Sequence, residues 1–259
     1  DFNGVFNTGA YASWGPTVGN RVPVHASGPY IYDAYRARSQ AVHTHCVPSG
    51  AFRGFGVPQS SIVQETLFDE LADKLAIDRL DFRLRNALVN GATTVCGQVF
   101  SEGVGIKDCL QSLKPHWDRA LSEADGFNAA SDGSLRRGVG VAGMWYGCGN
   151  TSLPNPSTIK VAIRNDGQVV LFQGAVDVGQ GANTVITQIC ADAAGLDILN
   201  FSLVYGDTDL TADAGKTSAS RQTFISGKAS YLAGQDLRKK ILRMVNASED
   251  ARLAINGSK

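Results

Sequence analysis

The sequence has no apolar run approaching the roughly 20 residues that a helix needs to cross a membrane, and neither sign of charge is in excess. Lysine and arginine together number 24, as do aspartate and glutamate, so the formal net charge is +0. A neutral chain lacks the positive field with which proteins usually bind nucleic acids or anionic membranes. We therefore expect neither nucleic acid nor membrane among its partners.

Residues typical of metal sites are also scarce. The five cysteines have no close pairs, which argues against a zinc ribbon or an iron–sulfur cluster held by this chain alone. Their odd number fits a reducing compartment, so we expect a cytoplasmic protein. His43 and His45 would share one face of a strand, but no third ligand is evident, so two ordinary histidines are favoured over a metal site.

Hydrophobic periodicity in the first half predicts strands followed by helices. Before residue 50 the chain reads as extended, with β-rich runs at 30–32 and 41–46. Three helices are expected next: one after Pro58, one over 79–89 with Asp78 as its N-cap, and one within 103–127. In the first of these helices the apolar positions recur every four residues, at Val63, Leu67, Leu71 and Leu75.

The second half has a different pattern, and together the halves predict an α+β fold. The elements expected here are a hairpin over 159–172, a helix after Gly181, a strand at 201–205 and a helix from about 224 to 245. Small polar residues without periodicity predict a linker at 128–136. We therefore expect two mixed lobes, residues 1–127 and residues 137–259.

Three loops stand out, at 51–59, 179–181 and 217–223. Each places small or hydrogen-bonding residues beside the expected start of a helix, where free backbone N–H groups favour an anion. Three such loops predict a cradle for one large, phosphate-bearing cofactor, although each alone also fits a plain turn or a helix cap. No Gly-x-x-x-x-Gly-Lys-Ser/Thr run is present, which argues against an ordinary nucleotide-binding protein.

The order of these motifs is more specific than any single loop. Ala51–Gln59 is followed by Glu65, Asp69-Glu70-Leu71-Ala72 and Asp81-Phe82-Arg83-Leu84-Arg85-Asn86, then by Gln173-Gly174-Ala175, Gly179-Gln180-Gly181, Gly206-Asp207-Thr208-Asp209 and Thr217–Thr223. Over essentially the whole chain this series resembles the molybdenum hydroxylase family of xanthine dehydrogenases and aldehyde oxidoreductases. The resemblance implies the α+β, two-lobed molybdopterin-binding domain of those enzymes.

The resemblance also implies cofactor contacts. In this family a pyranopterin dithiolene carries the molybdenum, and no side chain of the protein ligates it. Gln180 matches the glutamine that hydrogen-bonds the apical ligand on the metal. The other matching cofactor residues are Phe52, Arg53, Gly54, Gly179, Gly181, Thr217, Ser218, Ala219, Ser220, Arg221 and Gln222. Whether the pterin is the cytosine dinucleotide form stays open, and Fe–S clusters and FAD are expected on other segments or subunits.

The substrate side of the resemblance involves four residues. Ala51 belongs to the loop beneath the metal, while Phe55 and Tyr146 match two aromatic walls that would select flat substrates by stacking. Arg21, thirty residues before Ala51, matches the arginine that orients purines in xanthine-type members. A solvent-exposed loop arginine is the alternative.

Two features of the family are not found in the sequence: an upstream Gly-rich loop with a phenylalanine, and the late Gly-Glu glutamate that acts as general base. The resemblance thus implies a central piece of the molybdenum-binding subunit that is inactive alone. Its parent enzyme would hydroxylate a purine-like N-heterocycle or an aldehyde with oxygen from water. The expected partners are a small-molecule substrate, the remaining segments of the domain, and Fe–S and flavin subunits. The alternative is a non-catalytic fragment that only helps to bind the pterin or a partner subunit.

Overall fold

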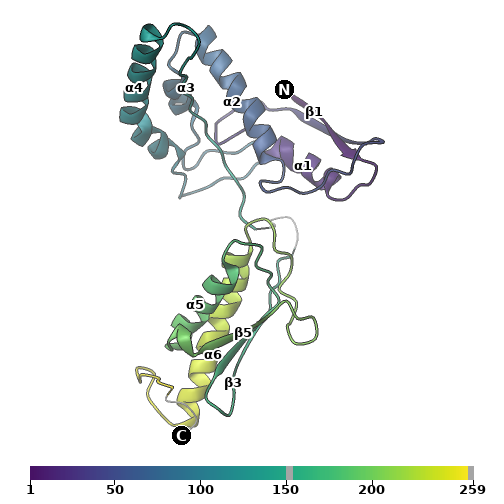
Figure 1. Cartoon of the computed structure of the whole chain (residues 1–259), viewed down its shortest axis with the longest axis vertical. Coiled ribbons are helices and arrows are strands. Elements are labelled where there is room, and N and C mark those ends of the chain that lie inside the picture. Colours follow the sequence, from purple (N-terminus) through teal and green to yellow (C-terminus); the bar gives the residue numbers. More distant parts are fainter. Residues whose placement is uncertain (150–153, 256–259) are drawn as a thin grey trace. The chain divides into compact units, whose positions relative to one another are not determined.

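The computed structural model describes residues 1–149 and 154–255 and confirms the α+β class (Figure 1). The chain forms two compact units, Asp1–Tyr146 and Gly147–Lys259. The division thus falls after the predicted linker at 128–136. Helix α4 (Ile106–Ala130) continues into that linker, and Val139 and Val141 pack against the apolar cluster of the N-terminal unit.

The N-terminal unit begins with a βαβ arrangement. Strands β1 (Phe2–Gly9) and β2 (Ala37–His43) pair in parallel, and helix α1 (Gly15–His25) lies in the crossover between them. The prediction that the first 50 residues are extended is wrong over α1. Its two glycines and the internal Pro23 lower the intrinsic helix propensity, and burial of residues such as Val22 compensates for this loss.

The three predicted helices of this unit are confirmed. Helix α2 (Val57–Lys74) has Pro58 in its first turn, and α3 (Arg79–Asn86) and α4 follow. Asp78 caps α3 as expected, because its side chain accepts hydrogen bonds from Leu80 N at 2.9 Å and Asp81 N at 3.0 Å.

The apolar stripe of α2 is turned outward. Val63, Leu67, Leu71 and Leu75 are between 36% and 59% exposed. The buried face instead carries Ser60, Gln64, Glu65, Phe68 and Ala72. Polar residues occupy this face because Glu65 meets a buried charge on α3.

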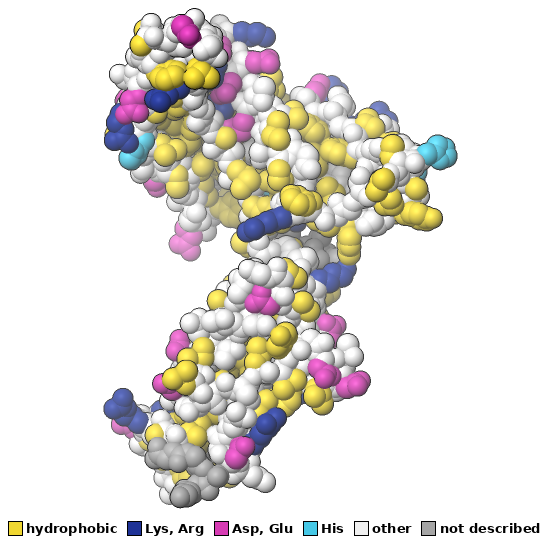
Figure 2. All heavy atoms as spheres, in the orientation of Figure 1, with side chains coloured by type: hydrophobic (Ala, Val, Ile, Leu, Met, Phe, Trp, Pro, Cys, Tyr) yellow, Lys and Arg dark blue, Asp and Glu magenta, His cyan; other side chains and the backbone are white. Residues whose placement is uncertain are grey.

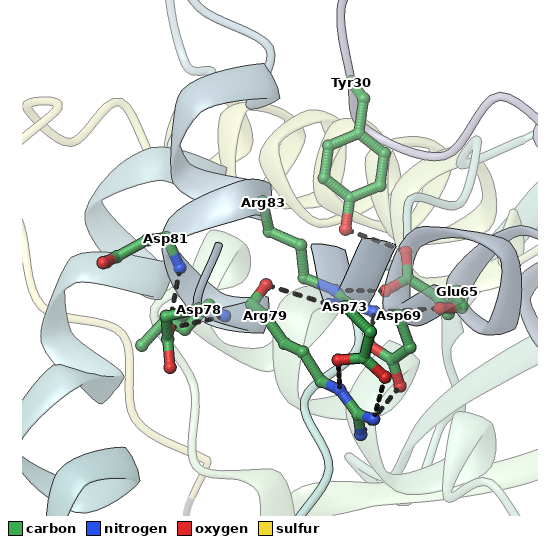
Figure 3. Close-up of polar contacts among 9 residues, drawn as sticks. Tyr30, Glu65, Asp69, Asp73, Asp78, Arg79, Asp81 and Arg83 are labelled. Carbon is green, nitrogen blue, oxygen red and sulfur yellow. Dashed lines mark hydrogen bonds and ion pairs between the residues drawn. The ribbon is translucent and has the colours of Figure 1, made fainter. Parts of the chain in front are cut away.

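That charge belongs to Arg83, which has no exposed side-chain surface (Figure 3). Its Nε donates to Glu65 Oε2 at 2.6 Å, and its Nη2 lies 2.9 Å from Asp69 Oδ1. The hydroxyl of Tyr30 donates to the other oxygen of Glu65 at 2.8 Å. Burial and the Glu65 charge raise the pKa of Tyr30, so its hydroxyl remains a donor at neutral pH. This network joins α2, α3 and the segment after α1.

The C-terminal unit is a three-stranded sheet with two long helices. Strand β3 (Ile159–Ile163) runs antiparallel to β4 (Val169–Gln173), which runs parallel to β5 (Phe201–Tyr205). Helices α5 (Ala182–Ala194) and α6 (Gly227–Met244) lie side by side (Figure 1). A single 3-10 turn (Ile198–Asn200) precedes β5, and a π-helical turn (Gln222–Ser226) precedes α6. The predicted hairpin, strand and helices of this half are confirmed.

The apolar core of this unit lies between the sheet and α5. Its buried members are Leu171, Ala175, Ala182, Ile186, Cys190 and Ala214. Because β4 is central in the sheet, Leu171 is fully buried, and the loop that leaves β4 toward α5 starts from a rigid base.

No helix among the described residues has an apolar stretch long enough to span a bilayer. On the face drawn in Figure 2, basic and acidic side chains are interspersed rather than gathered by sign. This distribution agrees with the neutral formal charge of the sequence.

The buried network predicts unequal effects for two arginine substitutions. Arg83→Met should lower the free energy of unfolding by about 3–5 kcal/mol, because it leaves Glu65 buried without its cation. Arg79→Met on the same helix removes only part-exposed ion pairs and should cost less than ~1 kcal/mol. Urea unfolding measures the free energy of unfolding of both variants. Equal losses would contradict the claim that the buried Arg83–Glu65 pair stabilises this unit more than the part-exposed pairs of Arg79 do.

The contact between α5 and α6 gives a second prediction. A Cβ added at Gly234 would lie 2.5 Å from Cys190 O and 2.9 Å from Ala193 Cβ, so Gly234→Ala should destabilise by about 1–3 kcal/mol. At the exposed Gly126 of α4 an added Cβ meets nothing within 4 Å. Gly126→Ala should therefore stabilise by up to about 1 kcal/mol. Thermal unfolding tests this pair, and a stabilising Gly234→Ala would show that the helices are less closely packed.

Candidate functional site

The loop before α2 has an unusual backbone. Gly54, Phe55 and Gly56 all have left-handed φ values, of 94°, 51° and 93°. Such a value is rare for a bulky residue such as phenylalanine. A Cβ on Gly56 would lie 2.7 Å from Val22 Cγ2 and 3.2 Å from Val18 O, so only glycine lets this loop approach α1. The loop is thereby held against the helix that carries Arg21.

The side chains of this loop differ in exposure. Phe55 is half-buried and packs edge-on against Trp14, with ring centroids 6.4 Å apart. Phe52 is 79% exposed, and Ala51 and Arg53 are exposed as well. The loop therefore offers open side chains at its start and an anchored aromatic ring at its end.

Two residues predicted on the substrate side, Arg21 and Tyr146, lie together. The guanidinium carbon of Arg21 is 4.8 Å from the centroid of the Tyr146 ring. Arg21 lies in α1 and not in an exposed loop. His25, one turn further along α1, lies against Tyr146 and Trp145, at ring distances of 6.1 and 5.9 Å. Trp145 was not anticipated from the sequence, where its only signal is its position beside Tyr146.

His25 adds no positive charge beside Arg21 at neutral pH. Burial lowers the pKa of its imidazole, and the neighbouring Arg21 cation lowers it further, while a hydrogen bond with the Arg21 carbonyl opposes this shift. The neutral ring of His25 therefore serves as a packing surface for the two aromatic residues.

In the C-terminal unit, the loop between β4 and α5 holds Gln180 in a defined orientation. Val178 N–H donates to Gln180 Oε1 at 2.6 Å, and Gln180 Nε2 donates to Val176 O at 3.2 Å. These bonds distinguish the amide oxygen from the nitrogen. The second N–H of Nε2 has no acceptor among the described residues, so the exposed side chain has one donor to offer a ligand.

The glycines on either side of Gln180 leave room for such a ligand. Gly179 and Gly181 have left-handed φ values of 104° and 79°. A Cβ on either would meet no atom within 4 Å, so the space beside their backbone is open.

An acidic side chain of the protein itself lies at the start of α5, where the sequence predicted an external anion. Asp177 Oδ1 accepts from Gly179 N at 2.8 Å and from Gly181 N at 3.3 Å, and its Oδ2 accepts from Asn183 N at 3.0 Å. A carboxylate of the protein itself therefore satisfies these N–H groups and faces the helix dipole. Free donors are therefore not found at Gly179, Gly181 and Asn183, whose N–H groups bond to Asp177.

The loop at 217–222 is held from inside by its last two residues. Arg221 is buried and donates to Ala214 O at 2.6 Å, to Pro156 O at 2.7 Å and to Lys216 O at 3.1 Å. Gln222 Nε2 donates to Lys216 O at 3.1 Å and to Thr217 Oγ1 at 3.3 Å. These side chains shape the loop, and its outward surface comes from other residues.

That outward surface is rich in donors. Ser218 and Ser220 are exposed. Ala219 and Ser220 have left-handed φ values of 53° and 55°, and their N–H groups have no acceptor in the part of the chain that the structure describes. Non-glycine residues in this conformation cost roughly 1 kcal/mol or more each, and such strain is concentrated at functional sites.

Thr217 joins this loop to the Gln180 loop. Its hydroxyl oxygen lies 3.1 Å from Val176 N and 3.0 Å from Val176 O, the carbonyl that also accepts from Gln180. Two of the three predicted loops are thus in contact within one unit. The third, at 51–59, belongs to the N-terminal unit, and its convergence with the others stays a prediction.

The donors of the two joined loops fit an organic cofactor. These loops offer exposed hydroxyls, an open glycine backbone, and carboxamide and backbone N–H groups that have no acceptor among the residues that the structure describes. These groups suit the phosphate and carbonyl oxygens of a large polar ligand. Among the described residues no three His, Cys, Asp or Glu side chains are grouped as in a metal site. His43 instead lies 3.3 Å from Thr8 Oγ1 and 3.2 Å from Gly9 O.

Two surface hollows lie away from these loops. One, of about 370 Å³, is lined by α2 and residues 140–142. The other, of about 600 Å³, lies between α5 and residues 196–198. Neither is lined by a residue predicted for the site.

Comparison with known proteins identifies the family. Residues 112–257 match the sequence pattern of a molybdopterin cofactor-binding domain, and residues 1–87 match a second pattern with the same description. The chain is 33% identical over 252 residues to the putative xanthine dehydrogenase molybdenum-binding subunit XdhA of Escherichia coli (strain K12), a match covering 91% of this chain and 31% of that protein. It is 30% identical over 234 residues to the aldehyde oxidoreductase of Megalodesulfovibrio gigas, covering 89% and 25%.

A solved structure agrees with these matches. The aldehyde oxidoreductase from Desulfovibrio desulfuricans superimposes with a TM-score of 0.83 and 28% identity, covering 96% of this chain and 27% of that one. The chain thus spans between 25% and 31% of the length of these relatives. It belongs to the molybdopterin cofactor-binding domains of the molybdenum hydroxylase family, which includes the xanthine dehydrogenases and aldehyde oxidoreductases.

Proposed function

We propose that this chain binds a molybdenum pyranopterin cofactor and contributes to the substrate pocket of a hydroxylase. The parent enzyme would oxidise a purine-like N-heterocycle, or an aldehyde, with oxygen taken from water. The observation that carries the proposal is the Gln180 carboxamide, which is fixed by two backbone hydrogen bonds and has one N–H without an acceptor within residues 1–149 and 154–255.

Gln180 would act as a preorganised donor to an oxygen ligand of the metal. When bound, the cofactor supplies the oxygen transfer and accepts two electrons from the substrate. Because the carboxamide of Gln180 is already held by Val176 and Val178, it needs no reorientation as charge develops on that ligand.

The loop at 217–222 would bind the organic part of the cofactor. Its exposed Ser218 and Ser220 hydroxyls and the N–H groups of Ala219 and Ser220 are suited to phosphate and pterin oxygens. Arg221 and Gln222 would act indirectly, by holding the backbone that presents these donors. Phe52, Arg53 and Gly54 would contribute from the loop before α2.

On the substrate side, Arg21 favours an N-heterocycle. Its guanidinium lies over the ring of Tyr146, so a flat molecule that stacks on this ring would come close to a permanent positive charge. That charge stabilises negative charge that develops on a heteroaromatic ring, which a simple aldehyde does not provide. Phe55 would form the other aromatic wall, next to Ala51.

The alternative is a chain that binds the pterin or a partner subunit without catalysing a reaction. Its basis is that no glutamate of this sequence lies in a Gly-Glu context, so a general base is not assigned to this chain. Fe–S and flavin components would receive the electrons on other segments or subunits. Elemental analysis of a full-length enzyme containing this chain tests the first proposal, because an active preparation without molybdenum contradicts it.

The role of Gln180 gives a kinetic prediction. In the full-length enzyme, Gln180→Ala should lower kcat/KM about 100- to 1,000-fold, the effect of removing one preorganised donor. Gln188→Ala, at an exposed position of α5 in the same unit, should leave kcat/KM unchanged. Steady-state rates and molybdenum content are measured for both, and equal activity of the two variants would exclude the proposed contact.

The role of Arg21 predicts a change in substrate preference. Arg21→Met should lower kcat/KM for a purine by about 100-fold, since a good charge-assisted contact is lost, and change turnover of an aldehyde much less. Arg38→Met, at an exposed position of β2, serves as the control. Parallel losses on both substrates would place Arg21 in a structural role.

A further inference from the structure

We propose that Asp177 is the positioning residue of the Gln180 loop. Its carboxylate occupies the start of α5 in place of a bound anion and fixes the loop in the shape that presents Gln180. The inference rests on the proposed role of Gln180.

The geometry of the Asp177 carboxylate supports this assignment. Both of its oxygens are used: Oδ1 accepts from Gly179 and Gly181, and Oδ2 accepts from Asn183 in the first turn of α5. The N–H groups that donate to Oδ1 therefore lie on either side of Gln180. The N–H group of Asn183, together with those of the loop, holds the pKa of Asp177 below its usual range, so the carboxylate remains charged at neutral pH.

The loop needs such a hold because its own residues provide little. Gly179 and Gly181 have open space where a side chain would be, and glycine has more backbone freedom than any other residue. Gln180 is exposed, so packing contributes little to its orientation. The carboxylate thus replaces the packing that these residues lack.

A second anchor lies at the other end of the loop. The hydroxyl of Thr217 accepts from the N–H of Val176 and donates to the carbonyl of Val176. Gln180 donates to that same carbonyl. Gln180 is therefore held between an anchor at Val176 and the start of α5. Since the Asn183 N–H of α5 is taken by Asp177, we expect an anionic part of the cofactor to bind at the 217–222 loop.

Three variants of the full-length enzyme test the inference: Asp177→Ala, Asp177→Asn and Asp166→Ala. Asp166 makes a similar bond, from Gln168 N at 3.0 Å, at the hairpin turn that precedes β4, whereas the Gln180 loop follows β4. Amide hydrogen exchange over residues 178–184, kcat, KM and molybdenum content are measured for each variant.

The expected results are specific to the loop. Asp177→Ala should speed exchange over 178–184 about tenfold or more, as loss of charge-assisted bonds implies. It should lower kcat at least tenfold with little change in KM, because Gln180 would act mainly in the transition state. The exchange rate and kcat of Asp177→Asn should lie between those of the wild type and Asp177→Ala. The amide oxygen of the new asparagine can still accept from Gly179, but its NH₂ group cannot accept from Asn183. Asp166→Ala should match the wild type.

Two outcomes would overturn the inference: unchanged exchange in Asp177→Ala, or faster exchange with an unchanged kcat. If Asp177→Ala does not fold, Asp177→Asn is judged by the same two criteria. Absence of molybdenum from the active wild-type enzyme would instead defeat the proposed function, and the exchange data would still report on the loop.

Discussion

The proposed site depends on side chains that satisfy backbone groups where no regular element does so. Between β4 and α5 the chain forms neither helix nor strand, and Asp177 and Thr217 supply the acceptors and donors that its backbone needs. Arg221 does the same for the carbonyl groups around Lys216. Both loops gain a defined shape while their outer surfaces remain open to a ligand.

In the N-terminal unit a charged side chain, Arg83, also holds neighbouring segments together, but it does so in the core. Arg83 and Glu65 determine which face of α2 is buried, and α2 begins directly after the loop that carries Phe55. Gly56 lets that loop approach α1, where Arg21 and Tyr146 lie together. The packing of α1 and α2 thereby sets the positions of the Arg21 cation, the Tyr146 ring and the strained loop at 54–56 within one unit.

Much of the secondary structure followed from the sequence, because periodicity, caps and turn residues act locally. Helix α1 was missed since its glycines and prolines weaken the local signal. The buried face of α2 was not foreseen because the pairing of Glu65 with Arg83 depends on residues 18 positions apart. The role of Asp177 was not foreseen, because it lies four residues before Gly181, the N-cap of α5, and so does not fit a capping pattern.

The family assignment followed from motif order, while the roles of individual residues remain proposals. Arg221 shows why a role cannot be assigned from sequence context alone. Its neighbours indicate a cofactor loop, yet its side chain is buried and bonded to carbonyl groups of its own unit. Sequence identifies which residues accompany a cofactor, but only geometry separates those that could touch it from those that hold the loop.

The most direct test is a crystal structure of the full-length enzyme with its cofactor bound. We expect Gln180 Nε2 within hydrogen-bond distance of an oxygen ligand of molybdenum, with the Val178 bond to Oε1 and the Asp177 bonds intact. A cofactor bound away from Gln180, or a phosphate seated on the N-terminus of α5 with Asp177 displaced, would contradict it.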